Sequence, residues 1–363
     1  MTGAVLLAGC AGGGAVTVPD TKPSSSASAA PSRDSFTVVA TGDVLIHPKL
    51  TEQAEADGNG VIDYRPLLAG VKPLVSGADL GICHLETPLA PAGGPYSGYP
   101  SFNAPPEIVD ALKDTGYDTC STASNHTLDR GQSGVTRTLN KLDAVGVKHT
   151  GSARSAQEAG TPLILDVRGV RVAQLSFAFG FNGIERPAGK PWLANQIDAG
   201  DILAAARAAK RAGAEVVIAS LHWGVEYQHE LTGEQEELAE ELTAAPEIDL
   251  IIGHHAHVVQ PFEKVNGKWV AFGLGNQVAR HDEPRGSTEE GTAARFRFTR
   301  ADGHWTVDQA EYLPSLIDLG PPLRLRDLTT SPVTPRGTRA LADTDRVVLS
   351  RGAGEQGLTR PGR

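Results

Sequence analysis

Several short motifs that would assign a function directly are absent from this sequence. It contains no Gly-x-Ser-x-Gly elbow of a serine hydrolase and no Walker loop. Gly273-Leu274-Gly275 lacks the third glycine of a dinucleotide-binding loop. His229-Glu230 is followed by Gly233, where a zinc-protease motif needs a histidine. None of the three cysteines is placed as a metal ligand, which argues against a structural thiolate zinc site.

The chain also lacks an excess of basic residues. Its 363 residues carry a formal net charge of −10. From Pro321 onward there are eight arginines and four acidic residues, so this segment carries +4 and the rest of the chain is near −14. An acidic body argues against nucleic acid as a partner and is compatible with the binding of cations.

No apolar run is long enough to span a membrane. The sequence nevertheless suggests a lipid anchor, because Leu7-Ala8-Gly9-Cys10 resembles the lipobox of bacterial lipoproteins, in which the cysteine is diacylated. Residues 11–35 are rich in Gly, Ala, Ser, Pro and Thr, which is the composition of a flexible tether. We therefore expect an extracytoplasmic protein attached to the cell membrane through Cys10.

The segment before Cys10 is shorter than a signal peptide. Only Thr2 to Gly9 precede the cysteine, and they include no Lys or Arg. A signal peptide needs a basic start followed by about 7–15 apolar residues. We therefore expect the true translation start to lie upstream of Met1.

Apolar segments of strand length alternate with segments of helical periodicity between residues 36 and 319. The predicted strands are Thr37–Asp43, Asp79–Glu86, Tyr117–Ala123, Pro162–Val167, Val170–Phe177, Glu215–His222, Leu250–Ile252, Gly267–Leu274 and Thr292–Phe298. The predicted helices are Asp63–Val75, Pro105–Lys113, Gly131–Ala144, Ala199–Ala212 and Gly233–Ala245. This alternation predicts one α/β domain with a parallel or mixed sheet. Residues 1–35 are then a lipoprotein remnant and tether, and residues 320–363 a disordered tail.

The stretch Ile248–Gln260 carries the strongest site signal. An apolar run, Leu250 to Ile252, is followed by His254, His255 and His257. In an extended segment His255 and His257 would face the same side. Neutral imidazole is the commonest metal ligand in proteins, so this spacing favours a metal site over a loop with incidental histidines.

Ligand-type residues follow several other predicted strands. Ligands of open α/β sheets bind beyond the carboxyl ends of the strands, so these residues are expected to converge. Taken singly, Asp43 or Asn125 is more typical of a turn or cap. Together the set offers carboxylate, amide and imidazole donors, which suit one or two divalent ions of Mn, Fe, Zn or Co. The candidate metal ligands are Asp43, Glu86, Asn125, His222, His255 and His257.

Seven motifs that occur in one order resemble those of a known family. They are Ala40–Asp43, His84–Leu89, Phe102–Pro105, Ala123–Gly131, Leu221–Tyr227, Gly253–Gln260 and Gly273–Asn276. The set resembles the bacterial capsule synthesis protein family CapA/PgsA, which is associated with poly-γ-glutamate. That family is similar to the calcineurin-like metallophosphoesterases, so the resemblance implies a four-layer αββα sandwich over residues 36–319.

The resemblance also implies a role for each candidate. Asp43 and His257 resemble ligands of a first metal, and Glu86 stands where the bridging aspartate usually lies. Three further residues resemble the ligands of a second metal: Asn125, His222 and His255. His126 resembles the histidine beside the scissile phosphate. Asp129 either orients His126 or caps the following helix, and Glu226 is either a site residue or a solvated charge.

The chain departs from the family pattern in its first motif, which is usually Asp-x-His. Here the next histidine after Asp43 is His47, and the bridging position holds the longer Glu86. Two functions therefore stay open. One is a metal-dependent phosphoesterase that acts on a phosphoester or a cell-envelope polymer in capsule or poly-γ-glutamate synthesis. The other is a non-hydrolytic lipoprotein that holds the polymer or the membrane proteins of a capsule-synthesis machine.

Cys83 and Cys120 lie in apolar runs of two predicted strands. A disulfide is permitted outside the cytoplasm. Two buried free thiols are the interpretation that the apolar surroundings favour.

Replacing Cys10 tests the lipid anchor. Stable anchoring needs more than one acyl chain, which lipoprotein processing would attach to this residue. We expect the wild-type protein to fractionate with membranes and Cys10→Ser to move to the soluble or secreted fraction, measured by immunoblotting. Cys83→Ser is the matched control and should stay with the membranes. Membrane fractionation of Cys10→Ser equal to wild type would contradict the lipobox.

Overall fold

The computed structural model describes residues 3–9, 34–332 and 334–362. The predictions for Cys10 and for most of the tether lie outside these residues. Residues 34–332 and 334–362 belong to one compact unit. Among the described residues, no helix has both the length and the apolar character required to cross a bilayer.

The larger of the two sheets is built around β1 (Ser35–Val44). β1 runs parallel to β2 (Leu80–Leu85) on one side and antiparallel to β12 (Glu290–Ala301) on the other. The order across the sheet is β14-β13-β12-β1-β2-β3-β4, with β11 paired to β1 and β15 to β13. The other strands of this sheet are β3 (Thr119–Ser121), β4 (Lys148–Thr150), β11 (Asn276–Val278), β13 (His304–Asp318), β14 (Arg324–Asp327) and β15 (Leu358–Thr359).

The second sheet has a parallel centre and antiparallel edges. Its order is β5-β6-β7-β8-β10-β9, in which β6, β7, β8 and β10 are parallel. The strands are β5 (Leu163–Val167), β6 (Val170–Ala178), β7 (Val216–His222), β8 (Leu250–His254), β9 (Phe262–Val265) and β10 (Lys268–Ala271).

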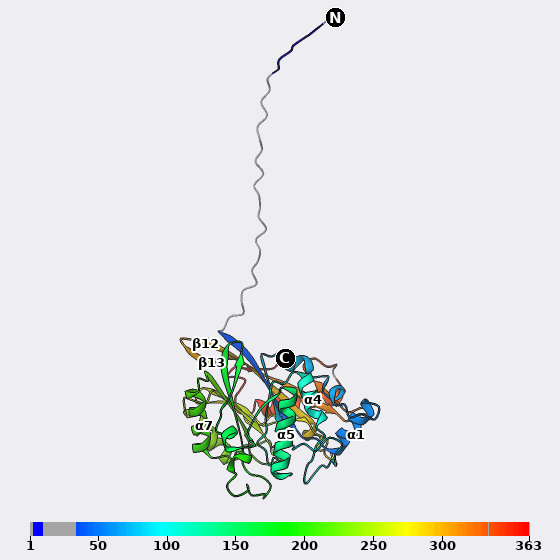
Figure 1. Cartoon of the computed structure of the whole chain (residues 1–363), viewed down its shortest axis with the longest axis vertical. Coiled ribbons are helices and arrows are strands. Elements are labelled where there is room, and N and C mark those ends of the chain that lie inside the picture. Colours follow the sequence, from blue (N-terminus) through cyan, green and yellow to red (C-terminus); the bar gives the residue numbers. More distant parts are fainter. Residues whose placement is uncertain (1–2, 10–33, 333, 363) are drawn as a thin grey trace. The chain divides into compact units, whose positions relative to one another are not determined.

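Helices cover the outer face of each sheet (Figure 1). The larger sheet is covered by α1 (Pro48–Asp57), α2 (Arg65–Leu68), α3 (Lys72–Ser76), α4 (Glu107–Thr115) and α5 (Gly131–Val145). The second sheet is covered by α7 (Ala199–Arg211) and α8 (Gly233–Ala244). The remaining elements are α6 (Ala156–Ala159), α9 (Pro335–Val348) and the short 3₁₀ helices η1 (Pro191–Leu193) and η2 (Ser287–Glu289).

The alternation of side chains along β1 explains the layering. Val38 and Ala40 pack into the core between the two sheets, while Val39 between them packs against the helices on the other face. Successive side chains of a strand point to opposite faces, so both faces of β1 must be covered and both are apolar. The predicted four-layer αββα class is confirmed.

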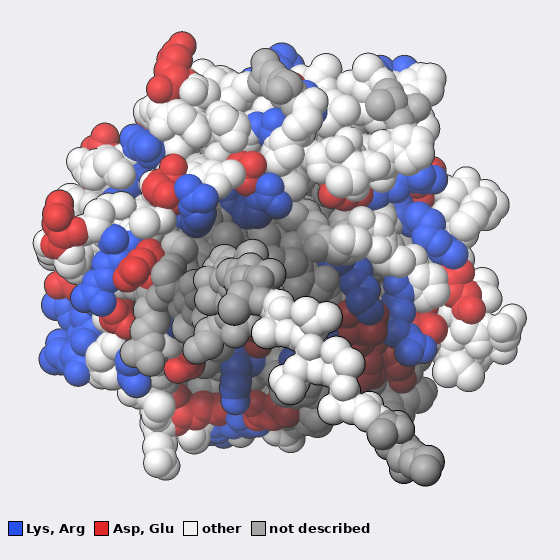
Figure 2. All heavy atoms as spheres, turned by 90° about the horizontal axis from the view of Figure 1, so that it is seen from above, with Lys and Arg blue, Asp and Glu red and all other residues white. Residues whose placement is uncertain are grey.

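The face of the molecule shown in Figure 2 carries charges of both signs. On the face shown in Figure 2, acidic and basic side chains are interspersed. The acidic excess of the chain is therefore not gathered into one patch on that face.

One predicted helix, Asp63–Val75, is two short helices in the structure. Pro66 and Pro73 lie in the first turns of α2 and α3. Proline is tolerated at a helix start because its missing N–H is not needed there, but it cannot continue a preceding helix. The two prolines therefore mark two starts.

The prediction of a disordered segment over residues 320–363 is wrong. This segment contains β14, α9 and β15. Thr334 caps α9 by accepting a hydrogen bond from the Gly337 N–H at 3.0 Å, and Pro335 occupies its first turn. Val347 and Val348 of α9 are buried in the core between the sheets. The high content of Pro, Arg, Thr and Gly led to the prediction of disorder, although part of this segment is a helix with one apolar face.

The cysteine prediction is also corrected. Cys83 on β2 and Cys120 on β3 are direct partners across two parallel strands and form a disulfide, with their Cα atoms 4.4 Å apart. The apolar surroundings favoured free thiols, and the sequence does not reveal which residues of two strands lie side by side. The bond closes a loop with a sequence separation of 37.

Thiol labelling tests this disulfide. In the Cys10→Ser protein unfolded in denaturant, we expect no labelling before reduction and two labelled thiols after it, counted by mass spectrometry. A loop of this size should stabilise the fold by about 3–4 kcal/mol, so reduction should lower the unfolding midpoint. Cys10→Ser/Cys83→Ala/Cys120→Ala serves as the unlabelled control. Two reactive thiols before reduction would restore the free-thiol interpretation.

Candidate metal centre

Asp43 lies near the end of β1 and is fully buried. The preceding Gly42 packs against the backbone of Gly275, where an added Cβ would be 2.0 Å from the carbonyl oxygen. The Asp43 N–H donates to the same carbonyl at 2.9 Å. Only glycine allows this approach, which fixes the backbone from which the Asp43 carboxylate projects.

Three groups from one short segment surround the Asp43 carboxylate. Nδ1 of His254 and Nδ1 of His257 lie 3.2 Å from Oδ1 and Oδ2 respectively, and the backbone N–H of His255 donates to Oδ2 at 3.1 Å. Burial alone would raise the pKa of Asp43, but its contacts with His254 and His257 outweigh burial and hold the pKa well below 3.8. Asp43 is therefore a buried anion.

The backbone that carries the histidines is not extended. β8 ends at His254, and His255 and His257 have φ values of +92° and +55°. The expectation that both side chains share one side of a strand was therefore wrong, although their ring centroids lie 6.0 Å apart. Left-handed backbone at a residue other than glycine costs about 1–3 kcal/mol and is found mainly at functional sites.

Glu86 follows β2 and is also buried. Neither carboxylate oxygen has a hydrogen-bond partner among the described residues, and the Nε2 atom of His257 lies 3.6 Å from Oε1. Burial raises the pKa of Glu86 well above 4.5. Burial would lower the pKa of His257, but Glu86 and Asp43 raise it to about 10. A buried carboxyl group without hydrogen bonds is energetically unfavourable, and a bound cation would stabilise its ionised form.

His222 ends β7 and links the two sheets. Its Nε2 lies 3.0 Å from Oδ1 of Asn125, and its Nδ1 lies 3.0 Å from Nε2 of His84. Burial and the nearby His255 lower the pKa of His222, and burial and His257 lower that of His255 to about 3. Both imidazoles are thus neutral near pH 7, which is the form that binds metal.

His126 and Asp129 form a separate pair. Nδ1 of His126 lies 2.8 Å from Oδ2 of Asp129, and the same oxygen accepts a hydrogen bond from the Phe102 N–H at 2.7 Å. Both side chains are buried. The N-cap position of α5 is Arg130, so the contacts of Asp129 favour orientation of His126 over helix capping.

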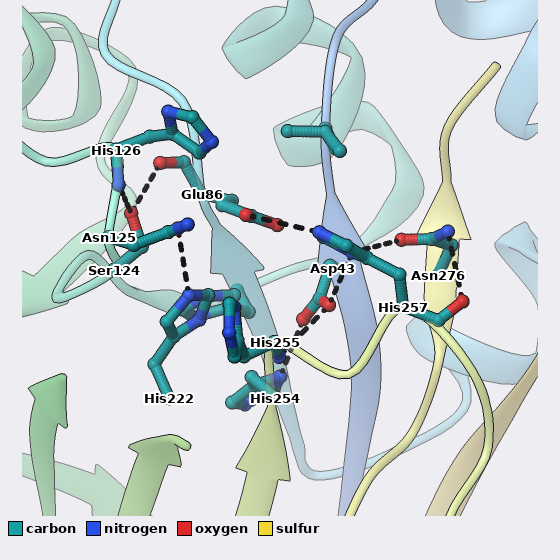
Figure 3. A network of polar contacts seen from close by, with 12 residues as sticks. Asp43, Glu86, Ser124, Asn125, His126, His222, His254, His255, His257 and Asn276 are labelled. Carbon is teal, nitrogen blue, oxygen red and sulfur yellow. Dashed lines mark hydrogen bonds and ion pairs between the residues drawn. The ribbon is translucent and has the colours of Figure 1, made fainter. Parts of the chain in front are cut away.

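The six candidate ligands lie in one network, together with residues that were not predicted as ligands (Figure 3). Asp43, Glu86 and His257 place one donor atom each within 4.8 Å of the others, as do Asp43, His84 and His222, and also Glu226, His255 and His257. Nδ1 of His257 also lies 2.9 Å from Oδ1 of Asn276. From the sequence, His84, His254 and Asn276 were not predicted as members of the site, although all three lie inside the family motifs.

This donor set fits divalent transition ions. It combines buried carboxylate oxygens, an amide oxygen and imidazoles, and it contains no thiolate. Four donor atoms of these sets, Asp43 Oδ1, both Glu86 oxygens and His255 Nδ1, are buried and have no hydrogen-bond partner in the described part of the chain.

Comparison with known proteins identifies the family. Residues 37–281 match the family described as "Bacterial capsule synthesis protein PGA_cap". The chain belongs to this family. The matched part of this PGA_cap protein contains all six candidate ligands together with His126 and Asp129.

Two relatives illustrate the similarity. The capsule biosynthesis protein CapA of Bacillus anthracis is 31% identical over 186 residues, covering 49% of this chain and 44% of CapA. The PGA biosynthesis protein CapA of Bacillus subtilis is 27% identical over 249 residues, covering 65% of this chain and 61% of that protein. The PGA_cap chain thus spans roughly half the length of these relatives.

A solved structure shares the fold. The "Putative 5'-Nucleotidase" of Staphylococcus aureus superposes with a TM-score of 0.51 at 17% identity, covering 86% of this chain and 58% of that one. At this identity the likeness concerns the fold alone.

Histidine replacements test the metal centre. His255→Ala and His257→Ala each remove a donor atom from a buried set, so we expect metal affinity to fall by about 10–100-fold or more, the range seen even for residues behind the ligands. Metal content after dialysis is measured by inductively coupled plasma mass spectrometry. His304→Ala, an exposed histidine on β13, is the control and should keep wild-type content. Full metal content in both site variants would contradict the assignment.

Proposed function

We propose that this PGA_cap protein is a divalent-metal-dependent hydrolase of the phosphoesterase type. It would act on a phosphoester or a cell-envelope polymer during capsule or poly-γ-glutamate synthesis, at the membrane surface to which Cys10 anchors it. The observation that carries this proposal is the pair of buried carboxyl groups of Asp43 and Glu86, both of which lie near His257. Asp43 Oδ1 and both Glu86 oxygens have no hydrogen-bond partner among the described residues.

The residues divide between two positions. Asp43, Glu86 and His257 would hold one ion of Mn, Fe, Zn or Co, and Asn125, His222 and His255 would hold a second beside it. When bound, such ions lower the pKa of a coordinated water and neutralise charge that develops on a phosphoryl group. The left-handed backbone at His255 and His257 restricts the positions of these two rings more than an exposed loop would.

His126 supplies the proton for the leaving group in this proposal. Its Nδ1 is engaged by Asp129, which orients the ring and leaves Nε2 for the substrate. Phe102 packs edge-on against the ring with centroids 4.7 Å apart and restricts its rotation. A positioned general acid contributes about 10²–10⁴ in rate.

A second function is favoured by the altered first motif. Position 45, where the family usually has histidine, is Leu45, and this side chain is buried against Phe102 and Ala279. A site that lacks this ligand suits a non-hydrolytic lipoprotein that holds a polymer or capsule-synthesis membrane proteins. Elemental analysis of the wild-type protein separates the two: about one or two ions per chain supports the hydrolase, and no stoichiometric metal supports the second function.

Two neighbouring residues give a sharper test of catalysis. Asn125→Ala should lose the second metal and activity together, because it removes a donor that lies 3.0 Å from His222. His126→Ala should keep its metal and lose turnover by about 10²–10⁴, most strongly for substrates with poor leaving groups. Turnover of aryl phosphates of graded leaving-group pKa is measured alongside metal content.

Asp129→Asn serves as the matched variant for His126. It keeps the shape of the partner of His126 but removes its charge, so it should show a smaller loss with an altered pH profile. Loss of metal in His126→Ala, or undiminished turnover, would exclude His126 as the acid.

A further inference from the structure

A basic pocket lies apart from the metal ligands, between the loop before η2 and helix α9. It encloses about 370 Å³ and is lined by Arg285, Arg336, Arg339, Arg346, Glu290 and Asp343, among others. Four guanidinium groups therefore face two carboxylates in a chain whose net charge is −10. Apart from His229, the residues that line the pocket lie outside residues 37–281, the part that matches the family.

The spacing along α9 gathers its charges on one side. Residues 336, 339, 343 and 346 are three or four positions apart, so their side chains lie along one face of the helix. The buried residues Ala340, Val347 and Val348 lie on the adjacent face and anchor the helix. The packing of α9 therefore presents this face to the pocket.

One arginine is fixed and the others remain available. Arg336 donates to Oε1 of the buried Glu290 at 2.6 Å and to the Gly286 carbonyl at 2.7 Å. Arg346 makes an exposed contact with Asp343 at 3.4 Å, and such pairs are worth little. Within the part of the chain that the structure describes, no carboxylate lies at ion-pair distance from Arg285 or Arg339. Unused guanidinium donors around one hollow are suited to a carboxylate or phosphate.

The pocket is connected to the metal centre through Tyr227. The guanidinium carbon of Arg285 lies 4.1 Å from the centre of the Tyr227 ring. The Tyr227 ring lies 6.2 Å from that of His257, and its N–H donates to the Ala256 carbonyl at 2.7 Å. Tyr227 has a φ of +65°, so its backbone is held in an unusual conformation at the boundary between the two sites.

Adjoining hollows make room for a long ligand. One of about 260 Å³ shares Gly286 and Arg336 with the basic pocket, and another of about 330 Å³ shares His229 and Arg346 with it. The three hollows follow one another along α9. An extended molecule fits this arrangement better than a single small ion does.

We propose that the basic pocket is a binding site for an oxyanion group, carboxylate or phosphate, of an extended anionic ligand that also reaches the metal centre. Arg285, Arg339 and Arg346 bind the anion, and Arg336 with Glu290 shapes the pocket. The proposal rests on the proposed function only in assigning both sites to one ligand. Anion binding itself is measured without metal, so its failure is distinct from failure of the hydrolase assignment.

The test compares a pocket variant with a matched surface variant. The full-length chain, freed of metal with chelator and dialysed, is titrated calorimetrically with pyrophosphate and, separately, with the tricarboxylate tricarballylate. Arg339→Gln/Arg346→Gln should weaken binding by about tenfold or more, because two charge-assisted donors are lost. Arg207→Gln/Arg211→Gln removes two exposed arginines of α7 and should stay within about twofold of wild type.

The outcomes separate the alternatives. Binding of pyrophosphate alone, lost in the pocket variant, supports the site and assigns it to phosphate, while binding of tricarballylate alone assigns it to carboxylate. All four exchanged arginines are exposed, so both double variants should fold, and circular dichroism verifies this. Equal affinities of the pocket variant, the surface variant and wild type, or no binding of either anion to wild type, would overturn the proposal.

Discussion

A single buried negative charge at the end of β1 organises this protein. The Asp43 carboxylate is fully removed from solvent and would be costly there without compensation. Its compensation comes from His254, His255 and His257 at the end of β8, so a strand of one sheet is tied to a strand of the other. Removing one member of such a buried set leaves the rest uncompensated, which is why the set acts as a unit.

The sandwich explains why the site needs both sheets. β1, β2 and β3 are parallel in one sheet, and β7 and β8 are parallel in the other. The carboxyl ends of both groups meet, so Glu86 and Asn125 face His222 and His255 across the layer boundary (Figure 3). The backbone packs closely at these strand ends, because a Cβ at Gly253 would lie 1.8 Å from the Phe272 carbonyl oxygen.

The C-terminal segment adds a feature of opposite charge to this acidic molecule. α9 buries Val347 and Val348 in the core between the sheets, and an adjacent face presents arginines to a pocket. Arg285 and Tyr227 form the boundary between that pocket and the histidines of the metal centre. The two proposed sites would combine a cation-binding cluster with an anion-binding surface, a pairing suited to a ligand that carries several negative charges.

The sequence by itself determined the α/β class and the candidate ligands, because apolar strands followed directly by Asp, Glu, Asn or His are local patterns. It also placed His126 beside Asp129 in the chain. Only the tertiary structure decided which strands are neighbours. Strand register joined Cys83 to Cys120. A left-handed backbone, and not an extended strand, positioned His255 and His257. The packing of one apolar face made α9 a helix. These outcomes depend on contacts between distant segments, which cannot be predicted from residue type and spacing alone.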